Sequence, residues 1–226
     1  MNHQEMWNKF CLVQQIADKG VPLFDTSAEQ NVSTVSIGRS RPRQVLRRSA
    51  EMENLVLAET DLLIDDWKSG RMKYDGLIYL MYTIKEQGDV IPLYIGKAET
   101  FGKNGGNLSA NIANLHRDKS KFARWGDGYA YHIGDLSAVA VPGHPSEKVT
   151  SKYINWASRL FEDFPRQHPK LKIPVHFWAK AWRNSEVGIW NDIGPTRLTF
   201  LEYLMIGVAS SAYPESLLNR EGQNRA

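Results

Sequence analysis

The sequence predicts an α/β (α+β) protein in which a small mixed β-sheet has flanking helices and a helical N-terminal extension before it. Two β-rich runs, at residues 76–84 and 90–95, are separated by a short turn-like segment, so we expect them to pair as a hairpin. Apolar residues at helical spacing precede and follow this hairpin. These observations divide the chain into an extension over residues 1–70 and a sheet domain over residues 71–226.

The extension is expected to contain two helices. Residues 5–17 carry apolar side chains at helical spacing and are followed by a glycine. A second helix is predicted over residues 51–68, because its apolar residues fall largely on one face, Ser49 can cap its start and Gly70 can end it. The polar residues 21–40 are expected to form a loop with one short strand.

The sheet domain is expected to continue after the hairpin with alternating helices and strands. The expected order is a helix over about residues 108–122, a strand over 129–133, a helix near 149–164, a strand over 172–182 and a last helix over about 196–209. Pro174 marks the start of the last of these strands or places it at an edge of the sheet.

Composition restricts the class of protein. The 226 residues are 42% hydrophobic and 23% charged, which is ordinary for a globular chain. The single cysteine, Cys11, excludes a scaffold held by intrachain disulfides. No apolar run approaches the ~20 residues that cross a bilayer, and the first residues do not resemble a secretory signal. We therefore expect a cytoplasmic protein with no membrane partner.

Positive charge is concentrated in two segments, although the net charge is only +3. Five arginines occur between residues 39 and 48 with no acidic residue among them, namely Arg39, Arg41, Arg43, Arg47 and Arg48. A second basic stretch lies between Arg117 and Arg124. Such clusters are typical of surfaces that bind polyanions, so the first cluster is a predicted nucleic-acid contact. A solvated, flexible segment is the alternative for either cluster.

Two tripeptides form the most specific pattern in the chain. Residues 77–79 read Leu-Ile-Tyr, and residues 94–96 read Tyr-Ile-Gly, with the two tyrosines fifteen positions apart and Lys97 directly following. This arrangement resembles the GIY-YIG nuclease family, whose name records two such tripeptides on adjacent strands of one hairpin. The second tripeptide is intact. In the first, a leucine takes the place of the glycine, and Gly76 lies one residue earlier.

The resemblance is tight over residues 76–99 and looser over 196–220. Residues 76–103 are most similar to the restriction-endonuclease branch, in which a glycine-containing loop follows the lysine. The resemblance implies a GIY-YIG-type catalytic domain over residues 71–226. It does not extend to the first seventy residues.

The resemblance also implies roles for individual residues. Tyr79 is the expected general base, and Tyr94 is expected to position water or phosphate. A tyrosine has a pKa near ~10 unless nearby cations favour its phenolate, and Lys97 lies at the end of the second strand, where it could act in this way. Glu202, in an apolar helix where an unpaired charge is costly, is the expected metal ligand, with a salt bridge to a core arginine as the alternative. Asn219 matches the family's closing Pro…Asn element.

The arginine that the family carries after its second tripeptide has no direct counterpart, because Asn111 stands near its expected position. Arg117 and Arg124 are both candidates, since a guanidinium can contact phosphate oxygens in a bidentate manner. His116 resembles a histidine that the restriction branch carries close to the scissile phosphate. His132 is expected to be structural.

Together these features predict an endodeoxyribonuclease that cuts double-stranded DNA with one Mg²⁺ or Mn²⁺ ion per active site. The resemblance favours a restriction or other genome-defence enzyme, and a homodimer would cut both strands of a palindromic site. Residues 1–70 are expected to enlarge the DNA-binding surface or to form the dimer interface. A catalytically inactive nucleic-acid-binding module, or a nuclease for RNA or for branched or damaged DNA, remains an alternative.

Overall fold

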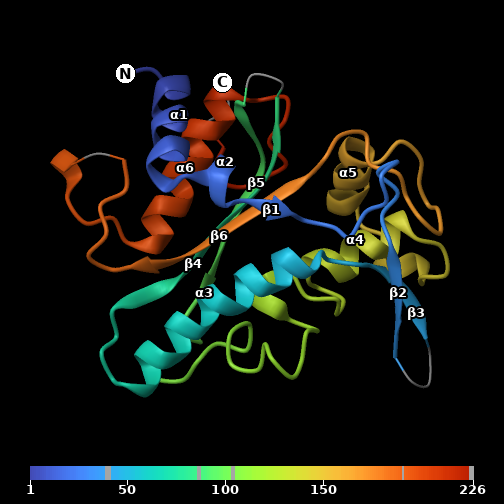
Figure 1. Cartoon of the computed structure of the whole chain (residues 1–226), viewed down its shortest axis with the longest axis horizontal. Helices are drawn as coiled ribbons and strands as arrows, with labels where there is room; N and C mark the ends of the chain where they lie inside the picture. Colours follow the sequence, from blue (N-terminus) through green and yellow to red (C-terminus); the bar gives the residue numbers. More distant parts are fainter. Residues whose placement is uncertain (39–41, 86–87, 103–104, 190, 224–226) are drawn as a thin grey trace.

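The computed structural model describes residues 1–38, 42–85, 88–102, 105–189 and 191–223. Its centre is a four-stranded sheet in the order β1-β6-β4-β5, in which each described pairing is antiparallel (Figure 1). These strands are β1 (Val21–Pro22), β4 (Tyr74–Ile84), β5 (Val90–Glu99) and β6 (His176–Arg183). A second sheet pairs β2 (Thr34–Ile37) with β3 (Arg43–Leu46). The α+β class is as predicted, but the central sheet is antiparallel where a mixed sheet was expected.

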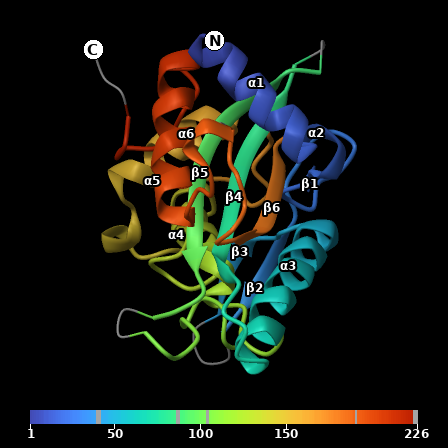
Figure 2. The same ribbon diagram turned by 90° about the vertical axis from the view of Figure 1, so that its left-hand side faces the viewer.

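Helices cover both faces of the central sheet. One face is covered by α1 (His3–Gln14), α2 (Ile16–Lys19) and α6 (Leu198–Ala212), and Figure 2 shows α1 and α6 side by side. The other face is covered by α3 (Ala50–Lys68), α4 (His132–Ala140) and α5 (Ser151–Leu160). Single 3₁₀ turns occur at Phe122–Arg124, Ser146–Lys148 and Asn191–Ile193. No helix in the described ranges combines the length and the apolar character that a membrane span needs.

Strand β4 separates two hydrophobic cores, because successive side chains of a strand point to opposite faces. Tyr79 and Met81 point into the core shared with α3, α4 and α5. Leu80 and Tyr82 point into the core shared with α1 and α6. Each core contains fully buried tryptophans, so the sheet is held between two large aromatic clusters.

Residues 1–70 share the sheet and both cores with the rest of the chain. β1 pairs with the start of β6, α1 packs against α6, and α3 packs against β4 and β6. The indole nitrogen of Trp7 donates a hydrogen bond to the carbonyl of Val90 at 2.8 Å, which fixes α1 to β5. The segment 21–40 contains β1 and β2, one strand more than predicted.

Most predicted elements occur at their expected positions. The helix over 5–17 is formed by α1 and α2, and the helix over 51–68 is α3, where the Ser49 hydroxyl accepts a hydrogen bond from the Met52 amide at 2.9 Å. The hairpin is β4 and β5. The later predicted helices are α5 and α6, and the strand between them is β6.

The helix predicted over residues 108–122 is absent, because the backbone there forms a series of turns. Polar side chains in this segment bond to nearby backbone and so compete with helix formation. The Ser109 hydroxyl donates to a carbonyl of β5 at 2.7 Å, and the Asp118 carboxylate accepts from the amide two residues later at 2.9 Å. The apolar spacing that suggested a helix comes from Ile112 and Leu115, which are buried from the turns.

The strand predicted over residues 129–133 is also absent. Residues 129–131 form a turn, and α4 begins at His132. The Asp135 carboxylate accepts a hydrogen bond from the Ala130 amide at 2.8 Å, which stabilises the start of this helix. This local hydrogen bond, five residues apart in the chain, favours the helix start over the strand that the aromatic and β-branched residues of the segment suggest.

The regular pairing of β4 with β5 from Tyr79 to Met81, which ends at a β-bulge at Leu93, places the two motif tyrosines on the same face of the sheet. Tyr79 faces Gly96 and Met81 faces Tyr94, but the next residue of β4 skips Leu93 in the pairing. Residues that face each other across a sheet point to the same side. Both tyrosines therefore point toward α4 and α5, and their rings are stacked with centroids 6.4 Å apart.

The ring of Tyr79 lies directly over Gly96. A Cβ atom at position 96 would lie 2.6 to 2.8 Å from Cε2, Oη and Cζ of the ring, closer than carbon and oxygen atoms can approach. A larger residue at this position would displace the ring or separate β4 from β5.

We therefore expect Gly96→Ala to destabilise the protein by about 1–3 kcal/mol, the usual effect of overpacking a core. Gly207 in α6 is the control, because a Cβ there would meet no atom within 4 Å, and Gly207→Ala should stabilise the helix by up to ~1 kcal/mol. Urea unfolding measures both changes. A Gly96→Ala protein as stable as the parent would contradict the close contact.

Candidate functional site

A pocket of about 360 Å³ lies at the edge of the sheet formed by β5. Polar and charged side chains from five separate parts of the chain line it: Tyr94, Arg124, Lys152, Glu202, Asn219, Arg220 and Glu221. The sequence analysis predicts four of these, and the structure brings them together from β5, the 3₁₀ turn, α6 and the segment that follows α6.

A larger cavity of about 600 Å³ lies between α1, α3 and β6. The charged groups around it take part in the fold: Lys180 pairs with Glu186, and the Glu59 carboxylate accepts a hydrogen bond from the Ala181 amide at 2.6 Å. The smaller pocket differs, because four of the residues that the sequence predicts for the site line it, namely Tyr94, Arg124, Glu202 and Asn219. We therefore place the candidate site in the smaller pocket.

Asn219 extends the sheet at this edge. Its side-chain oxygen accepts from the Ile95 amide at 2.9 Å, and its side-chain nitrogen donates to the Ile95 carbonyl at 2.8 Å. The amide of Leu218 also donates to the carbonyl of Leu93 at 2.7 Å. Both ends of the Asn219 carboxamide thus make a hydrogen bond to Ile95, so this residue holds the second tripeptide in place.

Glu202 projects from α6 into the pocket with its carboxylate largely buried. Burial raises the pKa of Glu202 to about 7, while the positive charge of Lys97 lowers it and the nearby Glu99 raises it. The ammonium of Lys97 is 3.9 Å from the carboxylate. A buried carboxylate with this incomplete compensation favours an added cation.

Lys97 lies on the α6 face of β5, opposite to the two tyrosines. Its ammonium donates to Glu99 at 2.5 Å and to the Thr199 hydroxyl at 2.6 Å. The expectation that Lys97 lowers the pKa of a tyrosine is therefore wrong for this structure. Burial raises the pKa of Tyr94 to about 12, and the charge of Glu202 adds to this shift while Arg124 opposes it.

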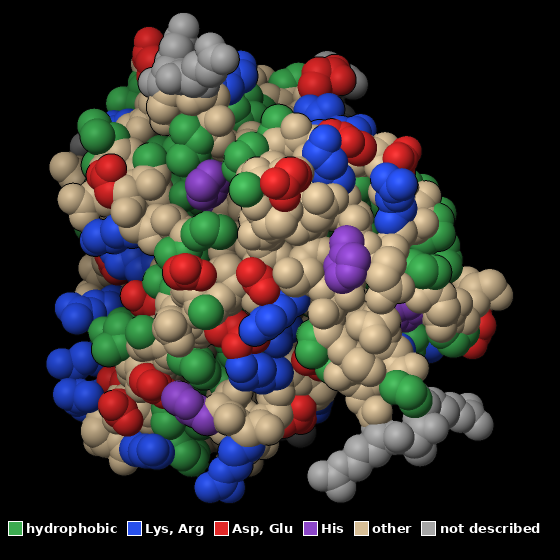
Figure 3. All heavy atoms as spheres, turned by 45° about the vertical axis from the view of Figure 1, so that its right-hand side comes forward, with side chains coloured by type: hydrophobic (Ala, Val, Ile, Leu, Met, Phe, Trp, Pro, Cys, Tyr) green, Lys and Arg blue, Asp and Glu red, His purple; other side chains and the backbone are tan. Residues whose placement is uncertain are grey.

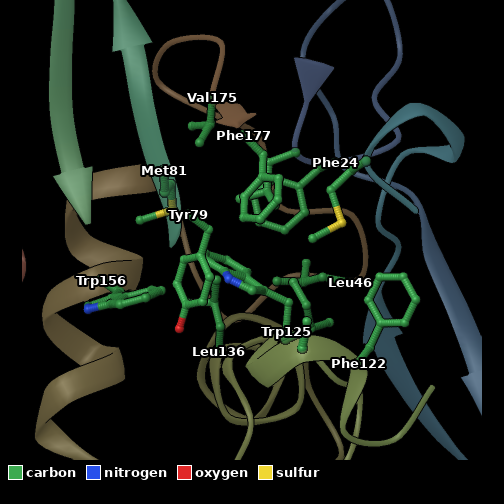
Figure 4. Close-up of a cluster of buried hydrophobic side chains, with 14 of the residues drawn as sticks. Phe24, Leu46, Tyr79, Met81, Phe122, Trp125, Leu136, Trp156, Val175 and Phe177 are labelled. Atoms are coloured by element: carbon green, nitrogen blue, oxygen red, sulfur yellow. The ribbon is translucent and has the colours of Figure 1, made fainter. Parts of the chain in front are cut away.

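Tyr79 is 2% exposed and does not line the pocket. Figure 4 shows its ring among Trp125, Trp156 and Phe177, and the Trp125 and Phe177 centroids are 5.7 and 6.1 Å away. Burial raises the pKa of Tyr79 well above its ordinary value. Both the exposure and the pKa therefore disfavour Tyr79 as the general base, and of the two motif tyrosines only Tyr94 lines the pocket.

Arg124 occupies an unusual backbone conformation. Ala123 has φ 50° and Arg124 has φ 75°, so two consecutive residues that are not glycine lie in the left-handed region. Such conformations cost about 1–3 kcal/mol each and occur often at functional sites. The strained turn directs the Arg124 side chain toward the pocket, with its guanidinium carbon 5.4 Å from the ring centre of Tyr131.

The other two predicted residues of this region lie elsewhere. Arg117 is exposed and does not line the pocket. His116 lies against α3, where its Nε2 is 2.8 Å from the carboxylate of Asp61. The turns that replace the expected helix point both side chains away from β5, so of the two candidate arginines only Arg124 is in the pocket.

The arginine cluster of residues 39–48 has mostly structural contacts. Arg39 and Arg41 lie outside the described residues. Arg48 is 7% exposed and donates to the Trp125 carbonyl at 3.0 Å, and its guanidinium lies 3.0 Å from Glu53. The predicted contact of Arg48 with nucleic acid is therefore wrong for this conformation, because the side chain is buried.

Two further residues of this cluster differ in exposure. Arg43 donates to the carbonyl of Asp127 at 2.7 Å and lies 4.0 Å from the ring centre of Tyr129. Arg43 and Arg48 thus hold the loop that carries the strained turn. Arg47 is exposed and lies 3.4 Å from Asp25, so it can still meet a polyanion. On the face in Figure 3, basic side chains alternate with acidic ones and do not form one continuous basic surface.

Sequence reasoning missed Lys152, Arg220 and Glu221. Lys152 is an isolated lysine in an amphipathic helix, and no motif distinguishes it from a solvated side chain. Arg220 and Glu221 directly follow Asn219, and this adjacency to the closing element was a usable signal.

The burial of Arg48 gives a stability prediction. Arg48→Met leaves Asp127 without its cation and Glu53 with Lys119 alone, and it should lower the free energy of unfolding by about 3 kcal/mol. Arg47→Met removes only an exposed pair and should change it by less than ~1 kcal/mol. Thermal and urea unfolding measure the change in stability of each variant, so the two adjacent arginines can be compared directly. Equal small effects would contradict a structural role for Arg48.

Comparison with protein-family models, with curated proteins and with solved structures finds no match for this chain.

Proposed function

We propose that this chain is a metal-dependent endonuclease that hydrolyses phosphodiester bonds in double-stranded DNA at the β5 pocket. The observation that carries the proposal is the meeting of Tyr94, Arg124 and Glu202, which are far apart in the sequence, in one pocket. These side chains supply a proton acceptor, a cation for the phosphate and a carboxylate for a metal ion. Each of these groups can accelerate phosphodiester hydrolysis.

Glu202 would hold one Mg²⁺ or Mn²⁺ ion. The raised pKa of this buried carboxylate fits the group, because a divalent cation would stabilise its charged form. No cluster of three or more acidic, histidine or cysteine side chains suited to a metal occurs among the described residues, so water and phosphate oxygens would complete the coordination, as is usual for Mg²⁺. When bound, the ion neutralises charge on the phosphate and lowers the pKa of a coordinated water.

Tyr94 would accept the proton of the attacking water, and Arg124 would bind the phosphate oxygens. Arg124 already lowers the pKa of Tyr94, and neutralising Glu202 would remove the charge that raises it. Tyr79 would act through packing, because its stacked ring sets the position of Tyr94. This assignment moves the general base from Tyr79, where the family resemblance implies it, to Tyr94.

Double-stranded DNA and a restriction or other genome-defence role are supported by the resemblance to the restriction branch. Two copies on a palindromic site would place one active site on each strand. The high pKa of Tyr94 favours one rival, a catalytically inactive nucleic-acid-binding module. Incubation with plasmid DNA separates them: the nuclease cuts with Mg²⁺ and stops with chelator, whereas the inactive module binds without cutting in either condition.

The tyrosine pair gives a sharper test of the proposed chemistry. Tyr94→Phe removes the proton acceptor but keeps the ring, so the single-turnover cleavage rate should fall by about 10²- to 10⁴-fold with DNA affinity preserved. Tyr79→Phe keeps the packing and should change the rate much less. A larger loss in Tyr79→Phe than in Tyr94→Phe would return the base to Tyr79.

The pKa of Glu202 makes metal binding depend on pH. The carboxylate must lose its proton to bind Mg²⁺, so Mg²⁺ affinity should fall about tenfold for each pH unit below 7 and level off above it. Glu202→Gln should abolish this binding, and Glu215→Gln, at an exposed position outside the pocket, should not. Calorimetric titration at several pH values measures the affinity. A pH-independent affinity, or unchanged binding in Glu202→Gln, would place the metal elsewhere.

A further inference from the structure

Lys152 is the lysine nearest to the reactive tyrosine. It lies in the first turn of α5, and its ammonium is 5.3 Å from the ring centre of Tyr94, 5.1 Å from that of Tyr153 and 5.4 Å from that of Trp156. Three aromatic faces thus hold this cation at the wall of the pocket. Lys97, which the sequence analysis placed in this role, is held by Glu99 and Thr199 on the other face of β5.

Arg124 and Arg220 face the same pocket as Lys152. Arg220 is anchored by a hydrogen bond to the Ser151 hydroxyl at 3.2 Å, next to Lys152 in the chain. Within the described residues, none of these three cations has a carboxylate within 4.0 Å. Burial lowers the pKa of Lys152, repulsion from Arg124 and Arg220 adds to this shift, and the carboxylates of Asp135 and Glu221 oppose it.

Three unpaired cations that line one pocket form a site for an anion. Glu202 and Glu221 line the same pocket, so a bound phosphate would meet positive charge from Arg124, Lys152 and Arg220 and a carboxylate from α6. The pocket therefore contains cationic side chains that can bind a phosphodiester and carboxylates that can bind a metal ion. The proximity of Lys152 to Tyr94 adds a third property, since a nearby cation favours the phenolate.

We propose that Lys152, with Arg124 and Arg220, forms a phosphate-binding site, and that Lys152 is the catalytic cation that contacts the scissile phosphodiester and stabilises the Tyr94 phenolate. The phosphate site stands on the geometry of the pocket alone. The catalytic part rests on the proposed nuclease function, so the two parts need separate measurements.

The first experiment measures binding of inorganic phosphate without any nucleic acid or metal. Lys152→Met should weaken phosphate affinity about tenfold or more, the effect of losing one charge-assisted contact, and Lys152→Arg should retain most of it. Lys148→Met is the matched control, because Lys148 also lies over an aromatic ring, 5.1 Å from the centre of Tyr129, but outside this pocket. NMR titration or calorimetry gives the affinity, and a melting curve confirms that each variant is folded.

Two outcomes of this experiment would overturn the phosphate site. One is a parent protein that does not bind phosphate, and the other is an equal loss of affinity in Lys152→Met and Lys148→Met. Neither outcome depends on whether the protein cuts DNA.

The second experiment measures cleavage as a function of pH. Lys152→Met should lower the single-turnover rate by at least about 100-fold and move the rising limb of the rate–pH profile to higher pH, because loss of the cation raises the pKa of Tyr94. Lys148→Met should keep both the rate and the profile. A lower rate with an unmoved profile would overturn the effect on the phenolate, since a merely structural residue would give that result.

A parent protein that cuts no DNA under any metal condition would overturn the proposed nuclease function. The phosphate titration would still decide whether the three cations form an anion site.

Discussion

The contact between the Tyr79 ring and Gly96 determines the geometry on which the site depends. The ring fills the space above a residue without a side chain, so β4 and β5 pair closely at the second tripeptide. In the regular register on either side of this contact Met81 faces Tyr94, so Tyr94 lies on the same face of the hairpin as Tyr79. The aromatic cluster around Trp125 and Trp156 packs on that arrangement. The tyrosine of the first tripeptide and the glycine of the second thus act as one steric unit.

The order and type of most elements could be predicted, because local patterns determine them. Ser49 caps α3 as its position before an apolar periodic run predicts, and the β4–β5 hairpin follows from two β-rich segments. The failures arose where tertiary contacts override local preference. The segment after β5 has helical apolar spacing, yet Ser109 bonds to the backbone of β5 and the chain forms turns. No local pattern contains that information.

The site could be predicted in part. Tyr94, Glu202 and Asn219 were predicted from the family resemblance, and all three line the pocket. The positive charge of an arginine did not by itself predict whether that residue lines the pocket, because arginines of the basic stretches have different roles in the structure. Arg48 is buried under the loop that carries Arg124, while Arg124 points toward the pocket from a strained turn. In the sequence, Arg48 and Arg124 are both arginines of basic stretches. Only the fold shows that Arg48 supports a loop and that Arg124 lines the pocket.

The pairing of the C-terminal segment with β5 imposes an order of assembly. The bonds between Asn219 and Ile95 join residues that are 124 positions apart in the sequence. A ribosome adds about 5–20 residues per second, so the edge of β5 stays unpaired for roughly 6–25 s after it is made. The pocket therefore cannot form until residues 219–221, which line it, have been made.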